Sequence, residues 1–68
     1  MSEELGNRLL ELRNAHGLTQ AALAEKVGVS RKTINTVENG VFVPSALLAL
    51  KIARSFERPV EEIFFLKD

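Results

Sequence analysis

Residues 19–40 have the sequence TQAALAEKVGVSRKTINTVENG, and this stretch predicts two short helices joined by a tight turn. Thr19 and Ser30 are typical N-cap residues, and each precedes a run that is compatible with a helix. Gly28 and Gly40 stand where the two helices should end, because the residue after a helix often needs a positive φ that glycine adopts easily. The three-residue connection beginning at Gly28 has the length that a helix-turn-helix uses to set two helices at a steep angle.

Apolar residues recur on one side of each predicted helix. Leu23 and Val27 have i, i+4 spacing in the first helix, and Ile34 and Val37 have i, i+3 spacing in the second. Ala24 is small enough to let the two backbones approach closely where the helices cross. We therefore expect both helices to pack into one core.

The stretch resembles the DNA-binding helix-turn-helix of the phage Cro/repressor-like regulators, which are also called the XRE type. The resemblance rests on Thr19-Gln20, Leu23-Ala24, Val27-Gly28-Val29-Ser30, Ile34, Val37 and Glu38-Asn39-Gly40. It continues through Pro44-Ser45, Leu50-Lys51-Ile52-Ala53 and Pro59-Val60-Glu61-Glu62-Ile63-Phe64, and so covers nearly the whole chain. Each piece is a weak signal alone, but their order along the chain is specific.

The chain has 68 residues, which is enough for one domain, residues 1–68, with the helix-turn-helix at about 19–39. Of these residues, 46% are hydrophobic and 26% charged, a composition that indicates a globular protein rather than a disordered one. The chain has no cysteine, so neither disulfides nor cysteine-bound zinc can stabilise it. A domain this small then needs efficient helix packing, a partner subunit, or both.

The periodicity predicts an all-α fold, a compact five-helix bundle, and the resemblance implies a lambda-repressor-like DNA-binding domain. The first helix is expected to begin at Ser2, with Glu3 and Glu4 in its first turn, and to end at His16-Gly17. After the two motif helices, a fourth is expected from Ala46 to about Phe56 and a fifth from Val60 to about Phe65. The residues expected to face the core outside the motif are Leu5, Leu9, Leu12, Leu47, Leu48, Leu50, Ala53 and Phe56.

Charge is distributed unevenly although the formal net charge is zero. The segment from Arg8 to Lys32 holds five Lys or Arg against two Glu, whereas the segment from Glu57 to Asp68 has a net charge of −2. A basic N-terminal part and an acidic C-terminal part are consistent with a protein that binds DNA through one side only.

The resemblance implies that the second motif helix lies in the major groove and contacts bases from its N-terminal part. The candidate base contacts are Arg31, Lys32, Thr33, Asn35 and Thr36. Arg and Lys can donate to guanine, Asn can pair with adenine, and the Thr methyl can touch thymine. Arg31 and Lys32 can also be ordinary solvated charges, but two cations at a helix N-terminus oppose the helix dipole, which favours an anionic partner.

The resemblance also implies contacts to DNA phosphates. The candidates are Gln20, Ser30, Asn39, Arg8 and Arg13, with Lys26 as a further possibility. Asn39 is equally explained by turn formation before Gly40, and Glu38 is expected to pair with a base such as Arg13 rather than to face DNA. Val41 departs from the family, which commonly has Lys or Arg there. Phe42 could instead touch the DNA.

The last residues indicate an assembly. Ile63, Phe64, Phe65 and Leu66, together with Val60, are more apolar groups than one short helix can bury in its own core. Members of the resembled family bind two-fold symmetric operators as dimers. We therefore predict a homodimer interface at Ile63, Phe64, Phe65 and Leu66.

Other activities find no support in the sequence. His16 is the only histidine, and its place beside Gly17 indicates a surface or capping residue rather than a metal ligand. No nucleophile–base pair or Gly-rich phosphate loop stands out, so we expect no enzyme activity, no cofactor and no small-molecule ligand. No apolar run is long enough for a membrane span, and the acidic start is unlike a signal peptide, which predicts a cytoplasmic, nucleoid-associated protein.

We therefore expect a prokaryotic transcription regulator, a repressor that binds a palindromic operator in double-stranded DNA as a homodimer. The alternative is a protein-interaction module of the same fold, such as an antitoxin that binds a toxin through its apolar loop and tail. The neutral net charge and Val41 favour the alternative, whereas Gln20, Arg31, Lys32 and Asn39 favour DNA.

Overall fold

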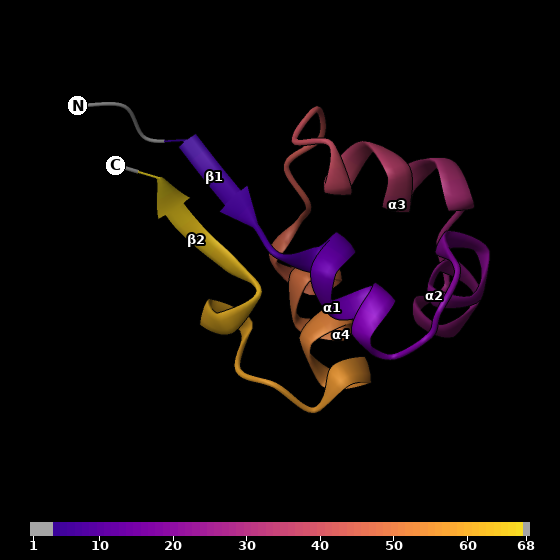
Figure 1. The fold of residues 1–68 in the computed structure, drawn as a ribbon. Coiled ribbons are helices and arrows are strands. Elements are labelled where there is room, and N and C mark those ends of the chain that lie inside the picture. The colour runs from indigo at the N-terminus through magenta and orange to yellow at the C-terminus, as the bar shows by residue number, and fades with distance from the viewer. Residues whose placement is uncertain (1–3, 68) are drawn as a thin grey trace.

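A computed structural model of the chain describes residues 4–67, and Figure 1 shows its elements. The described residues form four α-helices, one 3₁₀ turn and a two-stranded sheet, so the expected five-helix, all-α fold is only partly right. The elements in chain order are β1 (Glu4–Asn7), α1 (Leu9–Ala15), α2 (Gln20–Val27), α3 (Arg31–Glu38), α4 (Ala46–Phe56), the 3₁₀ turn η1 (Val60–Glu62) and β2 (Phe64–Lys67). None of the helices in residues 4–67 has the length and apolar content needed to cross a bilayer.

The helix-turn-helix begins and ends where its capping residues predict. The hydroxyl of Thr19 accepts a hydrogen bond from the Ala22 N–H at 3.0 Å, and that of Ser30 accepts one from the Thr33 N–H at 3.1 Å. Gly28 ends α2 in the left-handed conformation, with φ 78° and ψ 35°. The cap residues therefore fix the turn between α2 and α3 locally, before any tertiary contact is considered.

Residues 4–7 and 64–67 form a pair of antiparallel strands instead of parts of helices. β1 and β2 are antiparallel, with Leu5 opposite Leu66 and Gly6 opposite Phe65, and they project away from the helices (Figure 1). The prediction of a helix through residues 4–7 is therefore wrong, and its Ser2 cap lies outside the described residues. The predicted fifth helix is also wrong, because only Val60–Glu62 forms a 3₁₀ turn before the chain extends.

A close approach at Gly6 explains why the strands fit together. A Cβ atom built on Gly6 would lie 2.4 Å from Cε1 of Phe65, a distance that no packed structure tolerates. The Phe65 ring thus occupies the space where a side chain at position 6 would be. The guanidinium of Arg8 lies over the same ring, with Cζ 4.7 Å from the ring centroid. Phe65 therefore packs against Gly6 and Arg8 of its own chain.

The core joins all four helices, η1 and β2. Its buried apolar residues are Leu9, Leu23, Ala24, Val27, Ile34, Val37, Leu48, Ile52, Ala53, Phe56, Ile63 and Phe64. Leu5 and Leu12 pack against this core and are partly buried. The prediction for α4 is partly wrong, because Leu47 and Leu50 are exposed while Ile52, which the prediction omitted, is completely buried.

Candidate nucleic-acid interface

The start of α3 presents two cations to solvent. Arg31 and Lys32 follow the Ser30 cap, and both are exposed. Within residues 4–67, neither side chain has a hydrogen bond or ion pair, and α3 has no acidic residue in its first turn. Two unpaired cations beside the positive end of a helix form a local site for an anionic partner.

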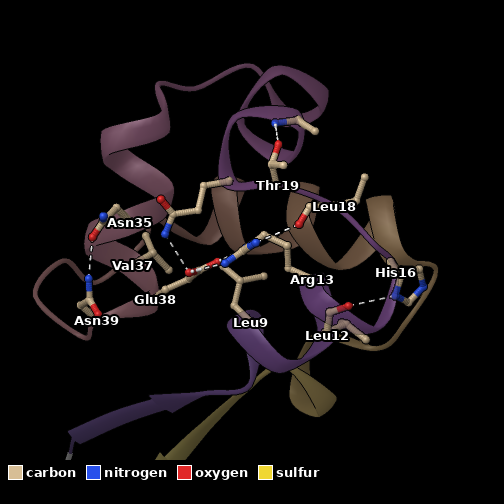
Figure 2. A network of polar contacts seen from close by, with 12 residues as sticks. Leu9, Leu12, Arg13, His16, Leu18, Thr19, Asn35, Val37, Glu38 and Asn39 are labelled. Carbon is tan, nitrogen blue, oxygen red and sulfur yellow. Dashed lines mark hydrogen bonds and ion pairs between the residues drawn. The ribbon is translucent and has the colours of Figure 1, made fainter.

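The remaining predicted base-contacting residues lie further along the same helix. The Thr33 hydroxyl lies 2.9 Å from that of Ser30, and the Thr36 hydroxyl donates to the Lys32 and Thr33 carbonyls at 3.1 and 3.0 Å. Because the Thr36 hydroxyl is bonded to the backbone, its methyl group is the part left for an outside contact. Asn35 accepts a hydrogen bond from the side-chain amide of Asn39, as Figure 2 shows.

The N-terminus of α2 lies beside the cations of α3. Thr19, Gln20 and Ala21 line a shallow depression of about 340 Å³ together with Arg13 and Arg31. The Thr19 hydroxyl and carbonyl bond Ala22 and Leu23, respectively, so the Gln20 and Ala21 N–H groups have no partner in the described chain. Free N–H groups at a helix N-terminus next to Arg31 are suited to an anion such as a phosphate.

A buried network ties α1, α2 and α3 together behind this depression (Figure 2). Arg13 donates from Nε to Glu38 Oε2 at 2.6 Å, from Nη2 to Oε1 at 3.3 Å, and from Nη1 to the Leu18 carbonyl at 2.8 Å. The predicted pairing of Glu38 with Arg13 is confirmed. The hydrogen bond to Glu38 raises the pKa of Arg13 above its usual range, so this guanidinium stays charged.

The same network orients Gln20. Its Nε2 donates to Glu38 Oε1 at 3.0 Å, which commits one of the two amide hydrogens. The second N–H and the carbonyl oxygen stay available at the mouth of the depression. Arg13, by contrast, uses all three guanidinium nitrogens inside the chain and is only 11% exposed. Arg13 therefore has a structural role in this network, and its predicted contact to a phosphate stays a prediction.

Arg8 lies apart from the other candidates. Its backbone N–H donates to the Ile63 carbonyl at 2.9 Å, and its Nη1 lies 3.5 Å from the Glu62 carbonyl. With its guanidinium over Phe65, Arg8 belongs to the junction of the strands with α1. It is exposed, but nothing brings it to the depression between α2 and α3.

The predicted dimer surface is largely internal. Ile63 is fully buried and Phe64 is 8% exposed, so these two residues contribute to the core of their own chain and cannot serve a second subunit. Phe65 is half-buried beside Gly6, and only Leu66 is freely exposed. The premise that the tail cannot bury its apolar groups is therefore wrong. Besides Leu66, the large apolar side chains exposed to solvent among residues 4–67 are Leu10, Val41, Phe42, Val43, Leu47 and Leu50, and all but Leu10 and Leu66 lie in the loop after α3 or on α4.

His16 has the capping role that its position predicts. It is exposed, its Nδ1 lies 3.0 Å from the Leu12 carbonyl, and its ring meets Phe56 edge-on with centroids 4.9 Å apart. Among residues 4–67 no three metal-ligating side chains are grouped closely enough to hold an ion.

Comparison with known proteins agrees with this geometry. The helix-turn-helix family model matches residues 9–63, from the start of α1 to Ile63, the residue after η1. An uncharacterized HTH-type transcriptional regulator of Bacillus subtilis, YgzD, is 45% identical over 62 residues, which cover 91% of this chain and 94% of that protein. A regulator of the same type from Methanocaldococcus jannaschii is 48% identical with the same coverage.

The fold is also similar to solved structures. The restriction-modification controller protein C.AhdI from Aeromonas hydrophila superposes with a TM-score of 0.77 at 38% identity, covering 81% of this chain and 83% of that one. Residues 9–63, which the family model matches, contain both motif helices and the network behind them. The chain therefore belongs to the XRE-type helix-turn-helix family of DNA-binding transcriptional regulators.

Proposed function

We propose that this protein is a repressor that binds a palindromic operator as a homodimer, with α3 of each copy in the major groove. The observation that carries the proposal is the unpaired, exposed pair Arg31 and Lys32 at the start of a capped helix. An α-helix fits the major groove, and Arg or Lys donating to guanine O6 and N7 is the commonest specific contact there. Binding to the operator then blocks access of the polymerase in the cytoplasm.

Further along α3, the proposed base contacts are Thr33, Asn35 and Thr36. The uncommitted methyl group of Thr36 suits a thymine methyl. The Asn35 amide oxygen already accepts a hydrogen bond from Asn39. Since an amide oxygen has two lone pairs, Asn35 can keep that bond and still accept from adenine N6.

Phosphate contacts flank the groove. We assign one phosphate to the depression at the α2 N-terminus, which Gln20 and Ala21 line and where their backbone N–H groups and the second amide hydrogen of Gln20 have no partner among the described residues. Ser30 and Asn39 sit at the two ends of α3 and are assigned the neighbouring phosphates. Such contacts fix the orientation of the protein but carry little sequence information.

The second candidate is a protein-interaction module of the same fold. The observation that favours it is the exposed loop of Val41, Phe42 and Val43, which puts apolar side chains where the family commonly has a cation. This candidate predicts binding to a protein partner with a nearly flat salt dependence, whereas binding to DNA phosphates predicts an affinity that falls steeply as the salt concentration rises.

Selection of bound duplexes from a random-sequence DNA pool at near-physiological salt tests the proposal. A palindrome with half-sites about one helical turn apart is expected. Enrichment of a single half-site would refute the dimeric operator but not DNA binding. If nothing is enriched and weak binding disappears at modest salt, the DNA-binding role is wrong and the interaction module takes its place.

Two variants then test the assignment of roles. Gln20→Ala should weaken binding about equally on cognate and random duplexes, because it removes a phosphate contact. Lys32→Ala should weaken the binding free energy by about 1–3 kcal/mol, mainly for the cognate duplex. Both losses are measured as dissociation constants by fluorescence anisotropy at one fixed salt concentration. Equal losses on both duplexes for both variants would mean that α3 does not read bases.

A further inference from the structure

Five exposed apolar residues form one surface, which we call the α4 patch. Val41, Phe42 and Val43 lie in the loop after α3, and Leu47 and Leu50 lie on α4; their exposed fractions run from 46% for Phe42 to 78% for Val41. Together they present on the order of 500 Å² of apolar side chain, the size of the largest patch on a typical monomer. A surface of this extent requires an explanation.

The patch is ordered and continuous. The N–H groups of Val41 and Phe42 both donate to the Thr36 carbonyl, at 3.0 and 3.2 Å, which ties the loop to the end of α3. Phe42 and Leu47 line the same depression of about 270 Å³. Leu47 and Leu50 are one helical turn apart on the side of α4 opposite Ile52 and Phe56, the residues that α4 gives to the core.

Charge distinguishes this surface from the rest of the chain. Residues 39–50 contain no Asp, Glu, Lys or Arg, although 26% of all residues are charged. Near a two-fold axis each residue meets its own copy, so any charge there would face a like charge at close range. An uncharged apolar patch complements itself, as an isologous interface requires, and the charge depletion matches the core of an interface.

We propose that two copies of this chain associate through the α4 patch, an inference that rests on the proposed homodimer and locates its interface. A standard interface buries about 800 Å² on each partner, with an apolar core and a polar rim. The α4 patch supplies a core of suitable size, and Asn39, Ser45 and Lys51 border it. Residues 60–67 supply much less exposed apolar surface, since Leu66 is the one freely exposed apolar side chain among them.

The position of the patch suits an operator. The patch starts at the C-terminal end of α3, whereas Arg31 and Lys32 are at its N-terminal end, about 12 Å away for a helix of this length. The α4 patch therefore lies at the opposite end of α3 from Arg31 and Lys32, so a dimer formed through the patch leaves these two cations exposed for an operator.

The test compares two leucines with similar exposure, Leu47 at 64% and Leu66 at 72%. Sedimentation equilibrium of the full chain measures the dimer dissociation constant of wild type, Leu47→Glu and the control Leu66→Glu. We expect an increase of at least about 100-fold for Leu47→Glu and less than about threefold for Leu66→Glu. Because both side chains are exposed, both variants should keep the wild-type circular dichroism. Val43→Glu provides a second variant in the patch and should behave like Leu47→Glu.

The outcomes separate the interface from the proposed function. If both patch variants sediment as wild-type dimers, or if Leu66→Glu alone dissociates, the α4 patch is not the interface. A monomeric wild type, with or without operator duplex, overturns the interface and the homodimer together. Binding to a duplex with one half-site, measured in parallel, reports on DNA recognition alone and should be nearly the same for Leu47→Glu and wild type.

Discussion

Replacing Glu38 by leucine should show how strongly the buried network holds the motif together. Glu38 is 4% exposed on its side chain, and it accepts hydrogen bonds from both Arg13 and Gln20. Without it, the Arg13 guanidinium stays buried with only the Leu18 carbonyl as a partner. Removing one member of a buried ion pair costs about 3–5 kcal/mol, and we expect the lower end because Arg13 keeps that bond.

The loss is large for a domain of 68 residues. At about 0.05–0.15 kcal/mol per residue, its whole free energy of unfolding is roughly 3–10 kcal/mol. A loss of about 3 kcal/mol should lower the melting temperature by about 12–24 °C. Arg13→Met should cost a similar amount, because it leaves the Glu38 carboxylate buried with Gln20 alone.

The double variant Arg13→Met/Glu38→Leu is the decisive measurement. It replaces the pair by apolar groups and leaves no buried charge, so it should be more stable than either single variant. Urea denaturation, followed by circular dichroism at one fixed protein concentration, gives the coupling free energy. We expect coupling of at least about 2 kcal/mol. Losses that add to within about 0.5 kcal/mol would refute the network as the tie between α1 and α3.

Three further predictions concern single positions. Gly6→Ala should lower the free energy of unfolding by about 1–3 kcal/mol, because the new Cβ meets the Phe65 ring. The loss should largely disappear in a Phe65→Ala background. An equal loss in that background would contradict the contact. Glu57→Gly should raise the free energy of unfolding by about 0.5–1 kcal/mol, since Glu57 ends α4 with φ 55°; a loss of stability would contradict this. Ser30→Ala should lower the free energy of unfolding by about 1 kcal/mol, because it removes the hydroxyl that caps α3, and Ser30→Thr should lower it by much less. Thermal and urea denaturation measure all three.

The centre of the chain could be predicted because its signals are local. Thr19, Gly28 and Ser30 act on neighbouring backbone groups, and the same residues set the helix ends in the structure. The pairing of Glu38 with Arg13 followed from the resemblance, and the helix geometry brings the two side chains together. The DNA contacts themselves stay predictions that only binding experiments can test.

The ends of the chain were predicted wrongly because their structure depends on distant partners. Leu5 and Leu9 fit a helical stripe, but residues 4–7 pair with residues 64–67, which are distant in the sequence. The run Phe64-Phe65-Leu66 does favour a strand, and it was a usable signal. The prediction that Leu47 and Leu50 face the core is wrong because the sequence does not show which side of an apolar helix faces inward.

The pairing of the two ends has a consequence for hydrogen exchange. Glu4 lies opposite Lys67, so the ladder between β1 and β2 closes almost the entire described chain into one loop. Within residues 4–67, neither strand has another strand to pair with, and one strand cannot keep the ladder when the other leaves. The amide hydrogens that bond across β1 and β2 should therefore exchange together, at one rate, from a single opening event that leaves the α2–α3 motif closed.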